Sequence, residues 1–302
     1  MPSLKEIKGR IGSVKSTLKI TSAMKLVASA KLRKAQQTIE GMRPYEMKLQ
    51  EILARVMEQA GAASFSGAYA RTEPQNASEE SETAAKQKIA LVAFASNSSL
   101  CGAFNANVVR LALETLRSYE NADVTVYSVG RKMAESMKKV GKPSPADYQK
   151  LADKPAYAPA AELAESLMEA YREGRLDRVD LVYNHFVSSG KQVPVRETLL
   201  PMGEIPSGVI PSEAKESDIE YILEPSAAEL LEDLLPKSLR LKFYTALLDS
   251  NASEHAARTV AMQTATDNGE DLLQELTLQY NKGRQQKITS EILDLAGGSQ
   301  EQ

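Results

Sequence analysis

The sequence predicts a mixed α+β and α/β protein, in which long N- and C-terminal helices form an antiparallel coiled coil beside a central Rossmann-like α/β domain with a mainly parallel sheet. Three observations predict this fold. Residues 237–302 contain no proline and few other helix breakers. Residues 1–43 repeat in heptads, the spacing of a left-handed coiled coil. Residues 88–200 alternate strand and helix patterns, which favours an open parallel sheet.

The N-terminal helix is predicted over residues 1–60. Its heptad seam advances by alternating steps of three and four residues and contains one charged side chain, Lys25. The other seam residues are Leu4, Ile7, Ile11, Val14, Leu18, Thr21, Ala28, Leu32, Ala35, Ile39 and Met42. Pro44 interrupts the pattern, but apolar spacing resumes at Tyr45 with a shifted phase. We therefore expect a kink or a short break at Pro44 and not the end of the helix.

The segment at residues 61–87 is polar and rich in small side chains, mainly Ser, Glu, Ala and Gln. It has too few apolar residues to bury the area that would offset the entropy lost on ordering. We predict a disordered insertion that lies on the surface, outside the coiled coil.

The central α/β domain is predicted over residues 88–225, where buried-strand runs alternate with amphipathic helices. The predicted strands are 89–95, 124–129 and 179–187, and the predicted helices are 106–119, 131–140 and 160–172. An extended segment follows the last strand at residues 192–200. We expect these two to pair as a hairpin across residues 188–191.

The C-terminal helix is predicted over residues 226–302. At about 1.5 Å per residue, a helix from residue 227 to residue 295 would be on the order of 100 Å long. No globular core of a 302-residue chain is that wide, so most of this helix must pack against something outside its own domain. The N-terminal helix is the internal candidate, and pairing the two gives the predicted coiled coil.

The composition excludes several classes of protein. The single cysteine, Cys101, rules out an internal disulfide, and the two histidines, His185 and His255, are far apart with no CxxC motif to complete a zinc site. No apolar run reaches the roughly 18 residues that span a bilayer, and the start lacks the apolar core of a signal peptide. We expect a cytoplasmic protein with no metal, no cofactor and no inserted membrane segment.

The first 37 residues are strongly basic, although the net charge of the whole chain is −3. Nine Lys and Arg residues face one acid, Glu6. Three kinds of partner would match such a surface: a nucleic-acid backbone, an anionic membrane or an acidic protein collar. An ordinary solvated helix face explains the charge equally well.

No catalytic or nucleotide-binding residue is predicted. Neither G-x-G-x-x-G nor the phosphate loop G-x-x-x-x-G-K-[ST] occurs. Cys101 follows the first strand and can be imagined as a nucleophile, but no base is paired to it, so a half-buried structural thiol is the commoner explanation. His185 and His255 are better explained as core or surface residues than as catalytic ones.

Several segments together resemble one protein family. They are ITSAMKLVASAKL at residues 20–32, LCGAFN at 100–105, ATDNG at 265–269 and YNKGRQ at 280–285. Their sequences, order and distances from the two termini are similar to those of the gamma subunit of bacterial F-type ATP synthases. The resemblance covers both ends and the middle of the chain.

The resemblance implies a non-catalytic rotor subunit of a rotary, proton-translocating ATP synthase. In that family the terminal helices pass through a hexamer of alternating alpha and beta subunits, and the α/β domain lies on the c-ring with the epsilon subunit beside it. It also implies six contact residues. Met24 and Lys25 would face an acidic segment of beta, Arg284 and Gln285 would meet a loop of a catalytic subunit, and Tyr221 and Glu224 would lie near the c-ring and epsilon.

The chain departs from the family pattern in three places. Residues 97–99 read Asn-Ser-Ser where the family commonly has Asp-Arg-Gly, the segment at 61–87 is longer than expected, and the regulatory cysteine pair of the chloroplast form is absent. Because the chain starts without an organelle presequence, we expect a bacterial subunit, peripheral on the cytoplasmic face of the inner membrane.

Two other functions stay open on the residues alone. A basic coiled-coil nucleic-acid binder would need aromatic side chains among its lysines, and residues 1–37 contain none. An α/β enzyme with helical arms would need a phosphate loop or a paired nucleophile and base.

Overall fold

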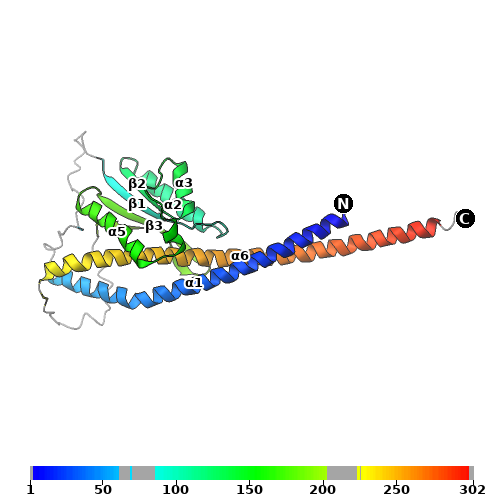
Figure 1. Cartoon of the computed structure of the whole chain (residues 1–302), viewed down its shortest axis with the longest axis horizontal. Helices are drawn as coiled ribbons and strands as arrows, with labels where there is room; N and C mark the ends of the chain where they lie inside the picture. The colour runs from blue at the N-terminus through cyan, green and yellow to red at the C-terminus, as the bar shows by residue number, and fades with distance from the viewer. Residues whose placement is uncertain (1–2, 61–68, 70–85, 203–222, 225, 299–302) are drawn as a thin grey trace. The chain divides into compact units, whose positions relative to one another are not determined.

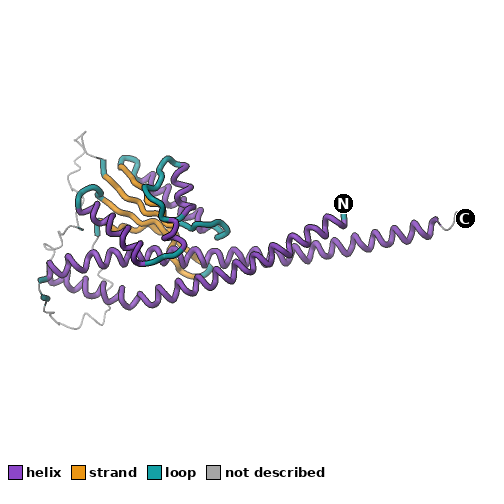
Figure 2. Tube along the Cα trace, in the orientation of Figure 1, coloured by secondary structure: helices purple, strands orange, loops and turns teal. Residues whose placement is uncertain are grey.

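The structure is a computed structural model that describes residues 3–60, 69, 86–202, 223–224 and 226–298. Its elements, in chain order, are α1 (Leu4–Ala60), β1 (Lys88–Phe94), α2 (Phe104–Ser118), β2 (Asp123–Val129), α3 (Arg131–Lys139), α4 (Gln149–Asp153), α5 (Tyr157–Arg172), β3 (Arg178–Ser188), β4 (Lys191–Leu200) and α6 (Ala227–Gly298) (Figure 1). Two long helices formed by the ends of the chain enclose in sequence a central series of short strands and helices, as the sequence predicts (Figure 2).

The chain forms two compact units. The coiled-coil unit comprises residues 1–30 and 258–302, and the α/β unit comprises residues 31–257. These units do not coincide with the predicted division at residues 60, 87 and 225, which stays a prediction.

Helix α1 begins with a serine N-cap and is not divided at Pro44. The Glu6 backbone N–H donates to Ser3 Oγ at 3.2 Å, which satisfies one of the free donors at the helix start. Pro44 lies inside the single helix and is exposed, so its ring meets solvent and not a packed neighbour. The helix therefore continues past Pro44 as expected, but without the short break that was one of the two expected alternatives.

The sheet of the α/β unit has the order β2-β1-β3-β4. Strand β1 pairs in parallel with both β2 and β3, and β3 pairs antiparallel with β4 across the tight turn at residues 189–190. The mainly parallel sheet and the hairpin are thus confirmed.

Both faces of the sheet are buried. Alternate β1 side chains divide between two apolar clusters: Ala90, Val92 and Phe94 belong to one, and Ile89 and Leu91 to the other. The first cluster also contains residues of α1, α5 and α6, and the second contains residues of α2 and α3. Burial on both faces explains why β1 reads as a continuous apolar run.

Two local predictions differ from the structure. Helix α4 is not among the predicted helices, because its five residues are too few to show helical periodicity. The predicted insertion at residues 61–87 lies outside the described residues except for positions 69, 86 and 87. Of these, Tyr69 is not on the surface: it is 7% exposed within the larger core, and its carbonyl accepts a hydrogen bond from the Met202 N–H at 2.9 Å.

Within the described residues, no helix is long and apolar enough to cross a membrane. No group of three or more metal-ligating side chains lies together in that part of the chain.

Candidate functional surfaces

Two glycines of α6 fix how the helices of the coiled-coil unit meet. A Cβ built on Gly269 would lie 2.7 Å from Leu18 Cδ2, and one built on Gly283 would lie 3.1 Å from Leu4 Cδ2. Fourteen residues, two heptads, separate the two glycines, and fourteen separate the two leucines. Equal steps in opposite directions are the register of an antiparallel coiled coil, and each glycine leaves space for one leucine.

A polar contact in the same register lies three residues from the Gly269–Leu18 contact on each helix. Thr266 Oγ1 donates to Thr21 Oγ1 at 2.9 Å, and Thr21 Oγ1 donates to the Leu18 carbonyl. Thr21 is buried, so the hydroxyl pair satisfies polar atoms that the seam removes from water.

The outer surface of the coiled-coil unit leaves large apolar side chains in water. Ile20 and Val27 are each 59% exposed and share one face of α1 with the half-buried Met24. On α6, Leu278 is 71% and Ile292 is 58% exposed. Among the described residues, these exposed apolar side chains are the candidate contact surface of the coiled-coil unit.

The two helices of this unit differ in charge. The basic residues of the α1 segment are Lys5, Lys8, Arg10, Lys15, Lys19 and Lys25, against one acid, Glu6. The α6 segment carries an exposed acidic group at Asp267, Glu270, Asp271 and Glu275. The α6 segment also has basic residues at Lys282, Arg284 and Lys287, so its acidic group is confined to residues 267–275. The two helices thus differ in charge pattern, and the coiled-coil unit has no rotational symmetry about its long axis.

The contact residues implied by the family resemblance lie on separate surfaces. Met24 and Lys25 are half-buried on α1, whereas Arg284 and Gln285 are exposed on α6. Since Gly283 meets Leu4, the two pairs are separated by about 20 residues of helix, roughly 30 Å. Glu224 is exposed just before α6, and Tyr221 lies outside the described residues.

The turn after β1 holds Cys101 in a packed position. The thiol is 1% exposed and receives a hydrogen bond from Asn105 Nδ2 at 3.1 Å. Ser96 Oγ lies 3.8 Å from Sγ. A side-chain amide donating to a buried sulfur gives it neither a base nor a path to substrate, so the arrangement supports the structural interpretation.

Asn97 explains one departure from the family pattern. Its Oδ1 accepts from the backbone N–H of Arg131, the first residue of α3, at 2.9 Å, and its Nδ2 donates to the Gln149 carbonyl of α4 at 2.7 Å. An aspartate could accept the first hydrogen bond but could not donate the second. The amide therefore links the β1 turn to two helices at once.

One side of α6 is joined to the β3–β4 hairpin by three polar residues, Lys242, Asp249 and Ser253. Lys242 Nζ donates to the Thr198 carbonyl at 3.2 Å, and Ser253 Oγ donates to the Asn184 carbonyl at 2.9 Å. Asp249 Oδ1 accepts from the backbone N–H of Phe186 at 2.8 Å. We call these three residues the α6 anchor residues.

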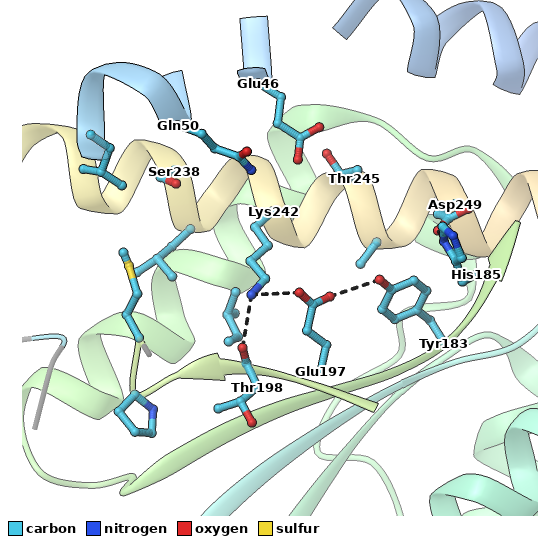
Figure 3. A pocket seen from close by; sticks show the side chains of 16 residues that line it. Glu46, Gln50, Tyr183, His185, Glu197, Thr198, Ser238, Lys242, Thr245 and Asp249 are labelled. Carbon is cyan, nitrogen blue, oxygen red and sulfur yellow. Dashed lines mark hydrogen bonds and ion pairs between the residues drawn. The ribbon is translucent and has the colours of Figure 1, made fainter. Parts of the chain in front are cut away.

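Side chains of the hairpin add to these contacts (Figure 3). The Glu197 carboxylate binds two partners: Lys242 Nζ lies 2.9 Å from its Oε1, and the Tyr183 hydroxyl donates to its Oε2 at 3.0 Å. His185 Nδ1 lies 2.5 Å from Asp249 Oδ2, within hydrogen-bond distance, so this histidine has a structural partner on α6. His255 is buried within α6, as expected from the sequence.

A cavity of about 730 Å³ lies between α1, α6 and the hairpin beside these contacts (Figure 3). Its walls hold three carboxyl groups, those of Glu46, Glu197 and Asp249. Burial raises the pKa of Asp249, although His185 and the Phe186 N–H hydrogen-bond to it. Burial, and then the neighbouring Glu197, also raise the pKa of Glu46.

Sequence patterns did not indicate a second polar network, which centres on the fully buried Asp180 of β3. Its carboxylate accepts from Tyr119 Oη at 2.6 Å, Arg178 Nε at 3.0 Å, Arg196 Nε at 2.9 Å and Thr198 Oγ1 at 3.0 Å. Burial and the hydrogen bond to Asp180 raise the pKa of Tyr119 to about 12. The network ties the end of α2 to the hairpin and leaves the buried charge fully paired.

Comparisons with known proteins point in one direction. The sequence profile described as ATP synthase matches residues 3–300. The ATP synthase gamma chain of Bacteroides fragilis is 51% identical over 304 residues, and the aligned region covers 99% of each chain. The ATP synthase gamma chains of Parabacteroides distasonis and Flavobacterium johnsoniae are 44% and 39% identical, again over 99% of each chain.

Solved structures with a similar fold come from the same kind of complex. A chain in the Euglena gracilis mitochondrial ATP synthase structure of OSCP, F1 and c-ring superposes with a TM-score of 0.62 at 22% identity, covering 98% of this chain and 93% of that chain. A chain of the Tetrahymena thermophila mitochondrial ATP synthase central stalk and c-ring structure gives 0.52 at 24% identity, covering 82% and 99%. At these identities the likeness shows that the fold is shared.

Proposed function

Because the chain belongs to the ATP synthase gamma chain family, we propose that it is the central-stalk rotor subunit of a rotary, proton-translocating ATP synthase. The observation that carries this proposal is the coiled-coil unit, whose two helices are locked in register, carry exposed apolar side chains and differ in charge pattern. It is a stalk subunit without catalytic residues of its own.

The asymmetry of the coiled-coil unit is what such a rotor needs. Three identical catalytic sites around a shaft without symmetry cannot all make the same contacts, so each orientation favours a different conformation at each site. Turning the shaft exchanges the three conformations and drives ATP release. In reverse, ATP hydrolysis turns the shaft, because coupling between binding sites is reciprocal.

The partners and location follow as parts of the same proposal. The two long helices would pass through the alpha and beta collar, and the α/β unit would meet epsilon and the c-ring. The complex would hold the chain peripherally on the cytoplasmic face of the bacterial inner membrane. Within the chain, residues 1–60 and 226–302 would act as the shaft and residues 88–225 as the domain that receives the ring's rotation.

The two other functions considered from the sequence are disfavoured. A nucleic-acid binder or an α/β enzyme would not be expected to match ATP synthase gamma chains over 99% of its length.

The proposal is tested by replacement. This chain is supplied to an ATP synthase that lacks its own gamma chain. We expect alpha and beta subunits to copurify with this chain, and ATP-driven proton pumping to return in membrane vesicles. Failure of the chain to copurify with alpha and beta subunits would contradict the proposal.

The predicted contact at Arg284 and Gln285 is tested in the same complex. We expect Arg284→Ala with Gln285→Ala to reduce ATP hydrolysis several-fold while leaving assembly intact, because both side chains are exposed on α6. Lys287→Ala is the matched control, since Lys287 pairs with Glu291 on its own helix at 3.7 Å. Equal effects of the two changes would exclude a specific contact at residues 284 and 285.

A further inference from the structure

The three α6 anchor residues share one face of the helix. Lys242, Asp249 and Ser253 are separated by seven and four residues, a spacing that returns to the same side of an α-helix. All three point at the β3–β4 hairpin, which is the antiparallel end of the sheet. They therefore form one row of contacts along the helix and not three isolated ones.

Each anchor residue contacts the main chain of a strand. Lys242 reaches the Thr198 carbonyl of β4, and Asp249 and Ser253 reach the backbone of β3. A strand's main chain is held by the hydrogen bonds of the sheet, so it cannot turn away as a side chain can. Movement of the hairpin is thus passed directly to α6.

The cavity shows why these contacts matter. Residues of α1, α6 and the hairpin line it. Around it, Leu239 and Phe243 of α6 share an apolar cluster with Leu199 of the hairpin. Among the described residues, the polar contacts therefore hold the part of the α6–hairpin interface where apolar side chains fill the space least completely. In Figure 3, Lys242 and Glu197 meet at the wall of this cavity.

We propose that Lys242, Asp249 and Ser253 are positioning residues that prevent α6 from turning about its axis relative to the sheet, and so carry torque between the α/β unit and the long C-terminal helix. This inference rests on the proposed rotor function. It assigns a share of the transmission of torque to particular polar contacts, in addition to the apolar core that α6 shares with the sheet.

The test uses complete ATP synthase in membrane vesicles, with this chain as the only gamma chain. Protons pumped per ATP hydrolysed are measured while the opposing proton gradient is varied. Lys242→Met removes the ammonium group and keeps the length of the side chain. Lys237→Met is the matched control, because Lys237 pairs within α6 with Asp233 and does not reach the sheet.

A second pair of variants separates the carboxylate from its volume. Asp249→Ala removes the acceptor for the Phe186 N–H, whereas Asp249→Asn keeps a side-chain oxygen in its place. Asp249→Asn should therefore keep the number of protons pumped per ATP, which Asp249→Ala should reduce.

Against a large gradient, we expect protons pumped per ATP to fall about twofold or more in Lys242→Met and Asp249→Ala, as for other contacts within coupled networks. Lys237→Met and Asp249→Asn should match the unmodified chain. A purely structural role would lower pumping and hydrolysis together and leave their ratio unchanged at every gradient. That result, in variants that assemble, would overturn the inference. If the unmodified chain supports no pumping, the proposed rotor function itself is wrong, and this inference with it.

Discussion

The Glu46 carboxyl group lies half-buried on α1 at the wall of the cavity, with Glu197 nearby. Its pKa in the folded chain is raised above the ordinary value of 4.5, first by burial and then by Glu197. An acid with a raised folded-state pKa holds its proton more tightly when folded. Stability therefore falls as pH rises from the unfolded pKa to the folded one, and the loss is complete above that range.

We expect Glu46→Gln to raise the Tm of the full-length chain at pH 7.5, because it removes a charge that burial disfavours. The gain should shrink as the pH falls through the folded pKa and vanish below about 4.5, where the carboxyl is protonated in both states. Thermal unfolding followed by circular dichroism at several pH values measures it.

Glu51→Gln is the control on the same helix, with the opposite sign. The hydrogen bond from Lys48 lowers the pKa of Glu51, so its contribution is favourable above the unfolded pKa and is lost as the pH falls through the folded pKa. Glu51→Gln should give no gain at pH 7.5. A Tm gain for Glu46→Gln that is the same at every pH would show that charge is not the cause.

The sequence could not predict which side chains meet across the folded chain. The anchor residues Lys242, Asp249 and Ser253 meet partners that are 44, 63 and 69 residues away in the chain. Which strand residue each one meets depends on the hairpin register and on the rotation of α6, and neither has a local pattern. Asp180 was missed for the same reason, since an acid inside a strand gives no sign of the two arginines that will pair with it.

The helices and strands themselves were predictable because their patterns repeat. Helices α1 and α6 contain 57 and 72 residues, enough for the heptad and helical spacing to outweigh one proline in each. Strand β1 was visible as an unbroken apolar run. Helix α4, with five residues, offered no period to detect.

The glycines of the terminal helices give a prediction about packing. Gly12 of α1 has open space where a Cβ would lie, so Gly12→Ala should stabilise the full-length chain by about 0.5–1 kcal/mol through helix propensity alone. At Gly269 the same substitution places a methyl group against Leu18, and overpacking typically costs about 1–3 kcal/mol. We expect Gly269→Ala to be destabilising by about 1 kcal/mol in urea unfolding, after subtracting the gain in propensity.

Combining Gly269→Ala with Leu18→Ala isolates the cause. If the methyl group and the leucine compete for one space, the double variant should be more stable than the sum of the two single changes predicts. Strict additivity would show that Leu18 does not occupy the space opposite Gly269.

At the scale of the whole molecule, charge distribution gives a prediction about assembly. Lys15 and Lys19 are exposed and lie one turn apart on the basic helix. If the collar is acidic, Lys15→Gln with Lys19→Gln should slow association of the chain with alpha and beta subunits at low salt. The difference should disappear near 1 M salt, where the screening length is about 3 Å.

Stopped-flow or surface-binding kinetics measure this rate. Lys138→Gln with Lys139→Gln, at the end of α3, makes the same change in charge on the α/β unit and should have no comparable effect. Equal slowing by both pairs would show that net charge, and not the basic helix, steers association.

Gly269, Leu276 and Gly283 occupy seam positions one heptad apart on α6. Their alternating sizes also determine how far α1 can slide along α6. If the helices slid by one heptad, about 10 Å, Leu18 would come level with Leu276 or Met262, where a large side chain already fills the seam. The nearest setting that again offers a glycine to a leucine is two heptads away and leaves about 20 Å of seam unpaired. The two helices therefore cannot slide past each other by a single heptad, and the length of the coiled-coil unit is fixed by its side chains.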